Sequence, residues 1–391
     1  MSPSKLKVIL IANYRPDRQE SMQRFARMLS EGLTARNIDH TVDYPAPILH
    51  RFHCGNAFLC KWFGYIDKFL IYPLILHRRL KKACPSACVV HICDHSNTPY
   101  TSVVRQFPHL ATCHDLTAIK SGLGITPHHK TRLSGKLLQR YIMRGLRTTK
   151  CIVCISAKTQ SDLQKLVPAA GKRSVTVFNA LNYPYTPMPE NASQAIVMPW
   201  VKSPFILHVG GNAWYKNRIG VLHIFAKMRR DFPDHKLVFV GPPPDQQQQS
   251  FLHTQGLAEQ VVFVQDIDNE TLRAFYSIAQ LLLFPSHEEG FGWPIIEAQA
   301  CGCPVAVVER DPMRTIAGQA RIRLPETPPH AASLEDWALT SAKAISQLLT
   351  QEKRDTLVAQ GLLNAQRFSH KEMIDAYVRI YEQLVNSVRH S

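Results

Sequence analysis

Two glutamates and two glycines within residues 281–308 have the types and spacing expected of a site for a polar ligand. Gly290 and Gly292 leave the backbone N–H groups of a loop uncovered just ahead of a predicted helix, whose N-terminal end is positive. Glu289 lies in the same loop, and Glu297 lies about one turn inside the helix. We therefore expect both carboxylates to converge on an anionic or polyhydroxyl ligand and to hold its hydroxyl groups.

The elements that must position these residues form a strand, loop, helix, strand unit. The apolar runs 281–284 and 304–308 predict strands, and apolar residues at helical spacing within 295–301 predict the helix between them. Pro294 suits the first turn of that helix, where a missing N–H leaves no bond unmade, and Gly302 suits its end.

The string from Glu289 to Glu297, with Gly-Phe-Gly and a proline between the two carboxylates, resembles the signature of the family-four retaining glycosyltransferases, or group 1 glycosyltransferases, of the GT-B fold. The resemblance implies that Glu289 and the loop amides of Gly290, Phe291 and Gly292 contact the donor sugar. It also implies that Glu297 binds the ribose of the nucleotide. The alternative for Glu297 is a side chain that only caps or solvates its helix.

A second part of the resemblance follows the predicted strand 204–209. Lys216 matches the family lysine that holds the donor diphosphate, and a lysine ahead of the predicted helix 219–228 suits a departing pyrophosphate. Many relatives carry an arginine just after the first glycine, where this chain has Gly211, so Arg218 is the candidate for the second positive charge. A solvated Lys216 is the alternative.

Polar residues also follow strands that are predicted in the first half of the chain. The apolar runs 6–12, 87–93 and 110–113 predict buried strands, and open α/β sheets bind ligands beyond the carboxyl ends of their strands. The pairs Asp94-His95 and His114-Asp115 come directly after the second and third runs. His114-Asp115 resembles the His-Asp pair of the family, which implies that His114 reaches the donor sugar near the reacting carbon; an ordinary hydrogen-bonded loop histidine is the alternative.

A basic loop joins the first predicted strand to the predicted helix 22–33. Relatives often have a glycine-rich loop here, but this loop has no glycine, so no dinucleotide-binding fingerprint is present. Arg15, Arg18 and Ser21 are candidates for contacts with a phosphate or the acceptor, and a solvated loop is an equal alternative.

The length of 391 residues and the 45% hydrophobic content predict two domains, because single cores stop growing at about 250–300 residues. The resemblance implies two Rossmann-like, doubly wound α/β domains that face each other across a cleft. We assign 1–190 to the acceptor side and 200–367 to donor binding, with the proline-rich segment 183–204 as linker. The C-terminal helix 368–386 is expected to cross back onto the first domain.

The formal net charge of +16 calls for an acidic partner. A nucleotide diphosphate, an anionic membrane surface or glycolipid, and nucleic acid are the candidates. Because no nucleic-acid-binding motif accompanies the charge, we expect no nucleic acid partner, and a non-enzymatic basic nucleic-acid-binding protein is the alternative of another class. No run of about 18 apolar residues is present, so we expect a cytoplasmic protein without a membrane-spanning helix.

The stretch 51–82 is dominated by aromatic and aliphatic residues and closes on Arg78, Arg79, Lys81 and Lys82. This pattern suits a segment that lies in a membrane interface with its basic end on anionic headgroups, which would place the protein on the inner face of the membrane. The equal alternative is a pair of amphipathic helices that pack on the sheet of the first domain.

Together these residues predict a retaining glycosyltransferase that moves a hexose, of mannose or glucose type, from a nucleotide-diphosphate sugar to a hydroxyl of a glycan or lipid-linked acceptor. Cell-envelope polysaccharide or glycolipid synthesis is the expected setting. Neither a cofactor nor a metal is implied, because Lys216 and helix ends carry the positive charge. Cys151 and Cys154 have CxxC spacing without a second pair of ligands, which favours free thiols over zinc. Among enzymes, the alternative is a relative that hydrolyses or epimerises a nucleotide sugar.

Overall fold

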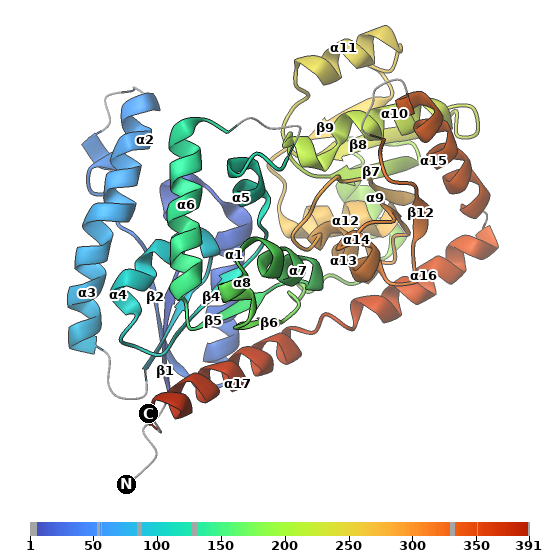
Figure 1. The fold of residues 1–391 in the computed structure, drawn as a ribbon. Helices are drawn as coiled ribbons and strands as arrows, with labels where there is room; N and C mark the ends of the chain where they lie inside the picture. The colour runs from blue at the N-terminus through green and yellow to red at the C-terminus, as the bar shows by residue number, and fades with distance from the viewer. Residues whose placement is uncertain are drawn as a thin grey trace. The chain divides into compact units, whose positions relative to one another are not determined.

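The computed structural model describes residues 6–52, 55, 57–83, 88–126, 131–328, 333–349 and 351–389. The chain forms two compact units, one made of residues 1–182 and 370–391 and the other of residues 183–369 (Figure 1). Within the described residues, each unit has a parallel six-stranded sheet covered by helices. This confirms the prediction of two Rossmann-like domains.

The sheet of the first unit has the order β2-β1-β3-β4-β5-β6, so the connections change direction between β1 and β3. Its strands are β1 (Lys7–Ile11), β2 (Asp39–Asp43), β3 (Cys88–Ile92), β4 (His109–Cys113), β5 (Cys151–Cys154) and β6 (Ser174–Thr176). Side chains of β3 alternate between the two faces of the sheet, as the pleat requires. Val90 and Ile92 join the core formed with Tyr72, and His91 contacts the C-terminal helix on the other face.

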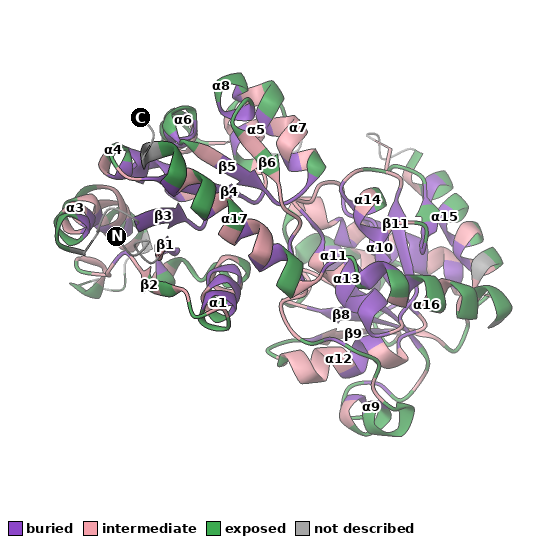
Figure 2. Cartoon of the chain, turned by 90° about the horizontal axis from the view of Figure 1, so that it is seen from below, coloured by how far each residue is buried: buried purple, intermediate pink, exposed green. Residues whose placement is uncertain are grey.

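Helices cover both faces of this sheet and leave their outer sides exposed (Figure 2). They are η1 (Arg15–Asp17), α1 (Glu20–Thr34), η2 (His50–Phe52), α2 (Ala57–Ile66), the π-helical turn η3 (Asp67–Ile71), α3 (Tyr72–Ala83), η4 (His95–Tyr100), α4 (Thr101–Val104), α5 (Thr117–Gly122), α6 (Leu133–Thr148), α7 (Ala157–Leu166), α8 (Pro168–Gly171) and α17 (His370–Arg389).

The C-terminal helix α17 returns to the first unit, as predicted, and packs on α1 and β3. The Tyr381 hydroxyl lies 2.7 Å from Nδ1 of His91, whose Nε2 lies 2.8 Å from the Thr112 hydroxyl. Gly32 of α1 faces Ile374 so closely that an added Cβ would lie 2.4 Å from its side chain. The glycine therefore permits the close approach of the two helices.

The sheet of the second unit has the order β12-β11-β10-β7-β8-β9, so its connections change direction between β7 and β10. Its strands are β7 (Phe205–Val209), β8 (Lys236–Val240), β9 (Val261–Val264), β10 (Leu281–Phe284), β11 (Val305–Val308) and β12 (Ile322–Leu324). The helices of this unit are α9 (Glu190–Val197), η5 (Trp214–Lys216), α10 (Arg218–Met228), α11 (Gln246–Thr254), α12 (Asn269–Ile278), α13 (Trp293–Ala300), α14 (Met313–Ala317), α15 (Leu334–Leu348) and α16 (Gln351–Ala365).

The predicted linker 183–204 is not a plain connection. It contains α9, which packs beside α12 and buries Val197. The Trp200 ring lies 5.7 Å from that of Phe275. Apolar contacts with α12 therefore make this segment part of the second unit.

The stretch 51–82 is largely helical, and α2, η3 and α3 follow one another without a break. Tyr72, Leu76 and Leu80 are buried against residues of β1 and β3, so one side of α3 packs on the sheet. In the part of the chain that the structure describes, no helix is long and apolar enough to cross a membrane.

Candidate functional site

The candidate residues of the second unit lie at the point where its sheet changes direction. Gly211 and Lys216 follow β7, and the loop with Glu289 follows β10, the neighbouring strand. Open parallel sheets bind ligands in the crevice beyond the carboxyl ends of two such strands. The strand order thus brings together two loops that are far apart in the sequence.

Three contacts hold these two loops against each other. The backbone N–H of His287 donates to the carbonyl of Tyr215 over 2.7 Å. The Asn217 side chain, which caps α10 at a φ of 53°, donates to the carbonyl of Pro285 over 2.9 Å. Nζ of Lys216 lies 2.7 Å from Oε1 of Glu289. The loops therefore have a defined arrangement before any ligand arrives.

The Lys216–Glu289 ion pair joins the residues that the family resemblance assigns to the donor diphosphate and to the donor sugar. Their side chains are only 18% and 9% exposed, so water screens the pair less than it screens a surface pair. Nζ of Lys216 also lies 5.3 Å from the centre of the Phe284 ring. A half-buried ammonium of this kind can exchange its carboxylate partner for the phosphate of a ligand.

Glu297 of α13 has a different partner. It is buried, and its Oε2 accepts a hydrogen bond of 2.9 Å from the Tyr276 hydroxyl of α12. Burial, together with the charge of Glu297, raises the pKa of the Tyr276 hydroxyl well above its ordinary value, so the hydroxyl stays a donor. The expected convergence of Glu289 and Glu297 on one ligand stays a prediction.

The glycine loop leads into α13 through Gly292, whose φ of 98° is a conformation that favours glycine. The Phe291 ring is buried, and its centre lies 5.6 Å from that of Phe368. Its side chain therefore belongs to the core, and the predicted sugar contact of Phe291 must come from its backbone N–H. The role of Gly290 likewise stays a prediction.

Arg218, the candidate for a second diphosphate contact, is buried at the start of α10. Its Nη1 donates to the carbonyl of Pro242 over 2.9 Å and contacts Oδ1 of Asn212, and its guanidinium lies 4.5 Å from the Phe239 ring centre. Burial lowers the pKa of Arg218 to about 10. Around Gly211, by contrast, the space for a Cβ is open. Arg218 thus links the loop of Asn212 to the loop of Pro242. Its contact with a diphosphate stays a prediction.

In the first unit, His114 lies just beyond β4. Its Nε2 lies 2.8 Å from the carbonyl of Cys93, which can only accept, so Nε2 carries the proton. Burial lowers the pKa of His114, partly offset by the charge of Asp94, so the ring is neutral. Nδ1 has no hydrogen-bond partner among the described residues and is therefore an acceptor suited to a hydroxyl.

A buried polar cluster at the ends of β1 and β3 was only partly foreseen. Nδ2 of Asn13 lies 2.6 Å from Oδ2 of Asp94, and Nδ2 of Asn97 lies 3.0 Å from Oδ1 of Asn13. Nδ1 of His95 lies 3.1 Å from Oδ1 of Asp94. Burial alone lowers the pKa of His95, but the hydrogen bond and charge of Asp94 raise it above its ordinary value. Sequence reasoning missed Asn13 and Asn97, although Asn13 lies just past a strand end.

The three candidates that follow β1, Arg15, Arg18 and Ser21, are exposed and do not belong to this cluster. The Arg15 guanidinium lies 4.3 Å from the Tyr44 ring centre, and Ser21 is at the start of α1. Their predicted contacts with a phosphate or the acceptor stay predictions.

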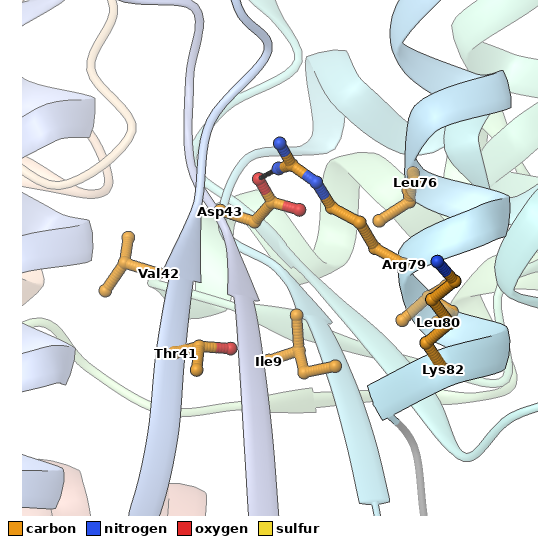
Figure 3. Close-up of a pocket in the computed structure, with 8 residues that line it drawn as sticks. All are labelled: Ile9, Thr41, Val42, Asp43, Leu76, Arg79, Leu80 and Lys82. Atoms are coloured by element: carbon orange, nitrogen blue, oxygen red, sulfur yellow. Dashed lines mark hydrogen bonds and ion pairs between the residues drawn. The ribbon is translucent and has the colours of Figure 1, made fainter.

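No group of acidic, histidine and cysteine side chains suited to a metal ion occurs among the described residues. Cys151 and Cys154 form no disulfide bond, and the expectation of free thiols in place of a zinc site stays a prediction. A cavity of about 380 Å³ lies between α3 and the edge strand β2, with Ile9, Thr41, Val42, Asp43, Leu76, Arg79, Leu80 and Lys82 around it (Figure 3). Its Asp43 and Arg79 form an ion pair, and none of the candidate site residues lines it, so it is separate from the candidate site.

Comparison with known proteins finds similar sequences and similar folds. Residues 196–359 match the model of the group 1 glycosyl transferases. The O-antigen chain mannosyltransferase B of Escherichia coli is 24% identical over 264 residues, which are 66% of this chain and 66% of that protein. The chain spans from about a quarter to about two thirds of the length of the first curated relatives it matches.

Two solved structures show the same fold. The sucrose-phosphate synthase of Thermosynechococcus elongatus has a TM-score of 0.76 at 18% identity, covering 98% of this chain and 100% of that one. The HepE protein of Anabaena, in complex with UDP and glucose, has a TM-score of 0.67 at 12% identity, covering 99% and 100%. The chain therefore has the GT-B fold, and its residues 196–359 are similar to the group 1 glycosyl transferases.

Proposed function

We propose that the chain is a retaining glycosyltransferase that moves a hexose, of mannose or glucose type, from a nucleotide-diphosphate sugar to a hydroxyl of a glycan or lipid-linked acceptor. The observation that carries the proposal is the Lys216–Glu289 ion pair, which joins the loops after β7 and β10 over 2.7 Å. A cation and a carboxylate held together at this point provide one group for a diphosphate and one for sugar hydroxyls.

The proposed mechanism gives each group a step. The diphosphate of the donor displaces Glu289 from Lys216, and the freed carboxylate accepts hydrogen bonds from the sugar. Lys216 then stabilises the negative charge that grows on the diphosphate as the bond to the sugar breaks. The leaving diphosphate takes the proton of the acceptor hydroxyl, so no separate protein base is required. His114 accepts a hydrogen bond from a sugar hydroxyl at its bare Nδ1.

The relatives support the choice of sugar and setting. The Escherichia coli relative is an O-antigen chain mannosyltransferase, and the Anabaena neighbour is a complex with UDP and glucose. We therefore propose a hexose donor, a role in cell-envelope polysaccharide synthesis and a cytoplasmic site of action. Neither a metal nor another cofactor is part of the proposal, and nucleic acid is not a partner.

The test uses the purified chain and a panel that includes GDP-mannose, UDP-glucose and UDP-N-acetylglucosamine. Calorimetry measures binding, and nucleoside diphosphate release is followed with and without glycan acceptors, in the presence and absence of EDTA. We expect one donor to bind and its sugar to appear on an acceptor with the anomeric configuration of the donor, as read by NMR. EDTA should leave the rate unchanged.

Three outcomes contradict the proposal. Release of free sugar without transfer identifies a hydrolase, and a changed nucleotide sugar identifies an epimerase. Binding of duplex DNA with no affinity for any donor identifies a basic nucleic-acid-binding protein. A product with inverted configuration overturns the retaining mechanism alone.

A further inference from the structure

The helix formed by α2, η3 and α3 has one apolar side that the first unit does not cover. Phe58 is 66% exposed, Trp62 44%, Leu70 63% and Leu74 67%. Single exposed apolar side chains are ordinary, but several on one continuous helix, where Leu59 is also 39% exposed, are not. We call Phe58, Trp62, Leu70 and Leu74 the apolar face.

The π turn η3 lies between the two halves of this face. In an uninterrupted α-helix, Leu70 would be rotated from Phe58 by about a third of a turn, because twelve residues do not make a whole number of turns. The π turn takes up an extra residue and so brings Leu70 and Leu74 back into line with Phe58 and Trp62. A π turn that aligns exposed apolar residues favours a binding role for them.

The opposite side of the same helix is buried in the first unit. Tyr72, Leu76 and Leu80 lie in the core against the sheet. Asp67, the helix's acidic residue, is buried and accepts from the Tyr14 hydroxyl over 2.8 Å and from the N–H of Leu49 over 2.8 Å. No carboxylate therefore belongs to the exposed side of residues 57–83.

Basic residues surround the apolar face. Lys61, Arg78, Lys81 and Lys82 of this helix are exposed. The next apolar and basic side chains come from α6, whose Tyr141 ring lies 6.0 Å from that of Phe69. Leu137, Tyr141, Lys136, Arg140 and Arg144 of α6 are exposed, and α6 contains no acidic residue.

The net charge of the whole chain is concentrated in this region of the sequence. Between Asp43 and Asp162 there are 17 lysines and arginines and three aspartates, which leaves a net charge of +14, out of +16 for the chain. The second unit and the rest of the first are thus nearly neutral. Positive charge that served only to keep the protein soluble would not need to be concentrated in one region of the chain. Positive charge that binds an anionic partner at one surface would.

We propose that the apolar face and its basic surround bind an anionic lipid bilayer. The aromatic and aliphatic side chains enter the boundary between headgroups and acyl chains, and the lysines and arginines contact anionic headgroups. The proposal rests on the proposed function and deepens it, because a lipid-linked acceptor is held in the same bilayer. Binding itself requires neither donor nor acceptor, and its test is independent of transfer.

The experiment is co-sedimentation of the full chain with vesicles of phosphatidylcholine that contain or lack phosphatidylglycerol, at low and high salt. The charge variant is Arg78→Gln/Lys81→Gln/Lys82→Gln, and it leaves Arg79 in its ion pair with Asp43. Its matched control, with the same loss of charge, is Lys202→Gln/Arg230→Gln/Lys353→Gln, all exposed in the second unit.

We expect binding only to the anionic vesicles and a loss of binding at high salt. Each basic residue at the surface contributes about fivefold, or about 1 kcal/mol, so the charge variant should bind roughly 100-fold more weakly. The matched control should bind within about twofold of the wild type, because its charges lie elsewhere. Equal weakening of both variants overturns the proposal, since charge alone would then explain binding.

The apolar variant is Phe58→Ser/Trp62→Ser/Leu70→Ser/Leu74→Ser, and its control is Leu339→Ser/Leu363→Ser, exposed residues of the second unit. We expect the apolar variant to bind at least tenfold more weakly. Undiminished binding overturns the proposal. The proposal is also overturned if the wild type does not bind vesicles but forms a dimer, and the apolar variant does not dimerise. The apolar face would then bind a second copy of the chain.

Fluorescence keeps the test decisive if the apolar variant does not fold. Bilayers with brominated acyl chains should quench tryptophan emission of the wild type, and Trp62→Phe should remove most of that quenching. Quenching that persists in Trp62→Phe shows that another surface meets the lipid and overturns the proposal.

Discussion

At the scale of single residues, the Lys216–Glu289 pair combines two charges that ligand binding must separate. Each side chain is mostly buried, so each needs a partner in the free protein, and each is the other's partner. A donor that carries both a diphosphate and sugar hydroxyls can satisfy both groups after they part. This offsets the free energy needed to break the pair.

Lys216→Ala is expected to lower kcat by about 100-fold or more and to change donor KM by only a few-fold. The charge on a departing diphosphate grows in the transition state, so the lysine contributes most there. Steady-state kinetics with saturating acceptor separates the two constants. Lys236→Ala is the control, because Lys236 begins β8, at the opposite end of the strand from the candidate loops. A Lys216 variant that loses only affinity would assign the lysine to uniform binding.

Glu297→Gln is expected to weaken nucleotide binding by about 1–1.5 kcal/mol, since a charge-assisted hydrogen bond to the ribose becomes a neutral one. Tyr276→Phe is its matched control, because it removes the hydroxyl that bonds Glu297 and leaves the carboxylate in place. Calorimetry gives the affinities and urea unfolding the stabilities. If Tyr276→Phe weakens binding as much as Glu297→Gln does, Glu297 acts through the packing of α12 on α13.

Residue types and spacing could identify Lys216 and Glu289 separately but not as a pair. The two are 73 positions apart, and their contact depends on β7 lying beside β10. The Asn13–Asp94–Asn97 cluster could not be predicted for the same reason, because it forms only where β1 lies beside β3. Contacts across the carboxyl ends of strands require the strand order, which no local pattern contains.

At the scale of elements, buried strands were the most predictable part of the fold. Strand β10 has the predicted bounds, and β7 and β11 differ by one residue, because both faces of these strands are covered and their sequences are continuously apolar. The edge strand β2, of sequence DHTVD, was not foreseen. An edge strand is covered less completely, so polar residues are tolerated and the apolar signal is lost.

Gly32→Ala is expected to destabilise the first unit by about 1–3 kcal/mol, because the new Cβ would lie 2.4 Å from the buried Ile374 side chain of α17. Gly64→Ala in α2 is the matched control, since its Cβ would lie 3.5 Å from the Tyr14 ring, an ordinary contact. There the higher helix propensity of alanine should raise stability by up to about 1 kcal/mol.

Urea unfolding measures both glycine variants, and Gly32→Ala/Ile374→Ala tests the cause. Removing the Ile374 side chain should make Gly32→Ala nearly neutral in that background. Additive losses would show that α1 and α17 adjust without strain and that Gly32 has another role.

At the scale of the whole molecule, the chain combines one neutral unit with one strongly basic unit. The second unit holds Lys216 and Arg218, while the first holds the apolar face and His114. The C-terminal helix α17 returns to the first unit and packs on α1 and β3, where His91 bonds its Tyr381. The stability of the first unit therefore depends on residues from both ends of the chain.

Buried neutral histidines should make this protein sensitive to mild acid. Burial lowers the pKa of His91 to about 3 and, more than any opposing contact, that of His109 to about 4. In the unfolded chain both titrate near about 6.5. Below that pH the unfolded state binds protons that the folded state does not, so the free energy of unfolding falls as pH falls. The stabilisation is complete above about pH 6.5 and is lost toward pH 4.

The prediction is a loss of about 1.4 kcal/mol per pH unit for each such histidine between pH 6 and 4.5. His109→Gln should lower stability at pH 7.5, because Nδ1 of His109 lies 2.9 Å from the carbonyl of Phe107, and should also flatten the pH dependence by one histidine's share. His253→Gln, at an exposed site of α11, should leave the dependence unchanged. Urea unfolding at four pH values from 7.5 to 4.5 gives the free energy of unfolding of the first unit and its slope with pH.

Equal slopes in wild type and His109→Gln would mean that His109 takes up a proton in the folded chain. The acid sensitivity would then have to come from other groups.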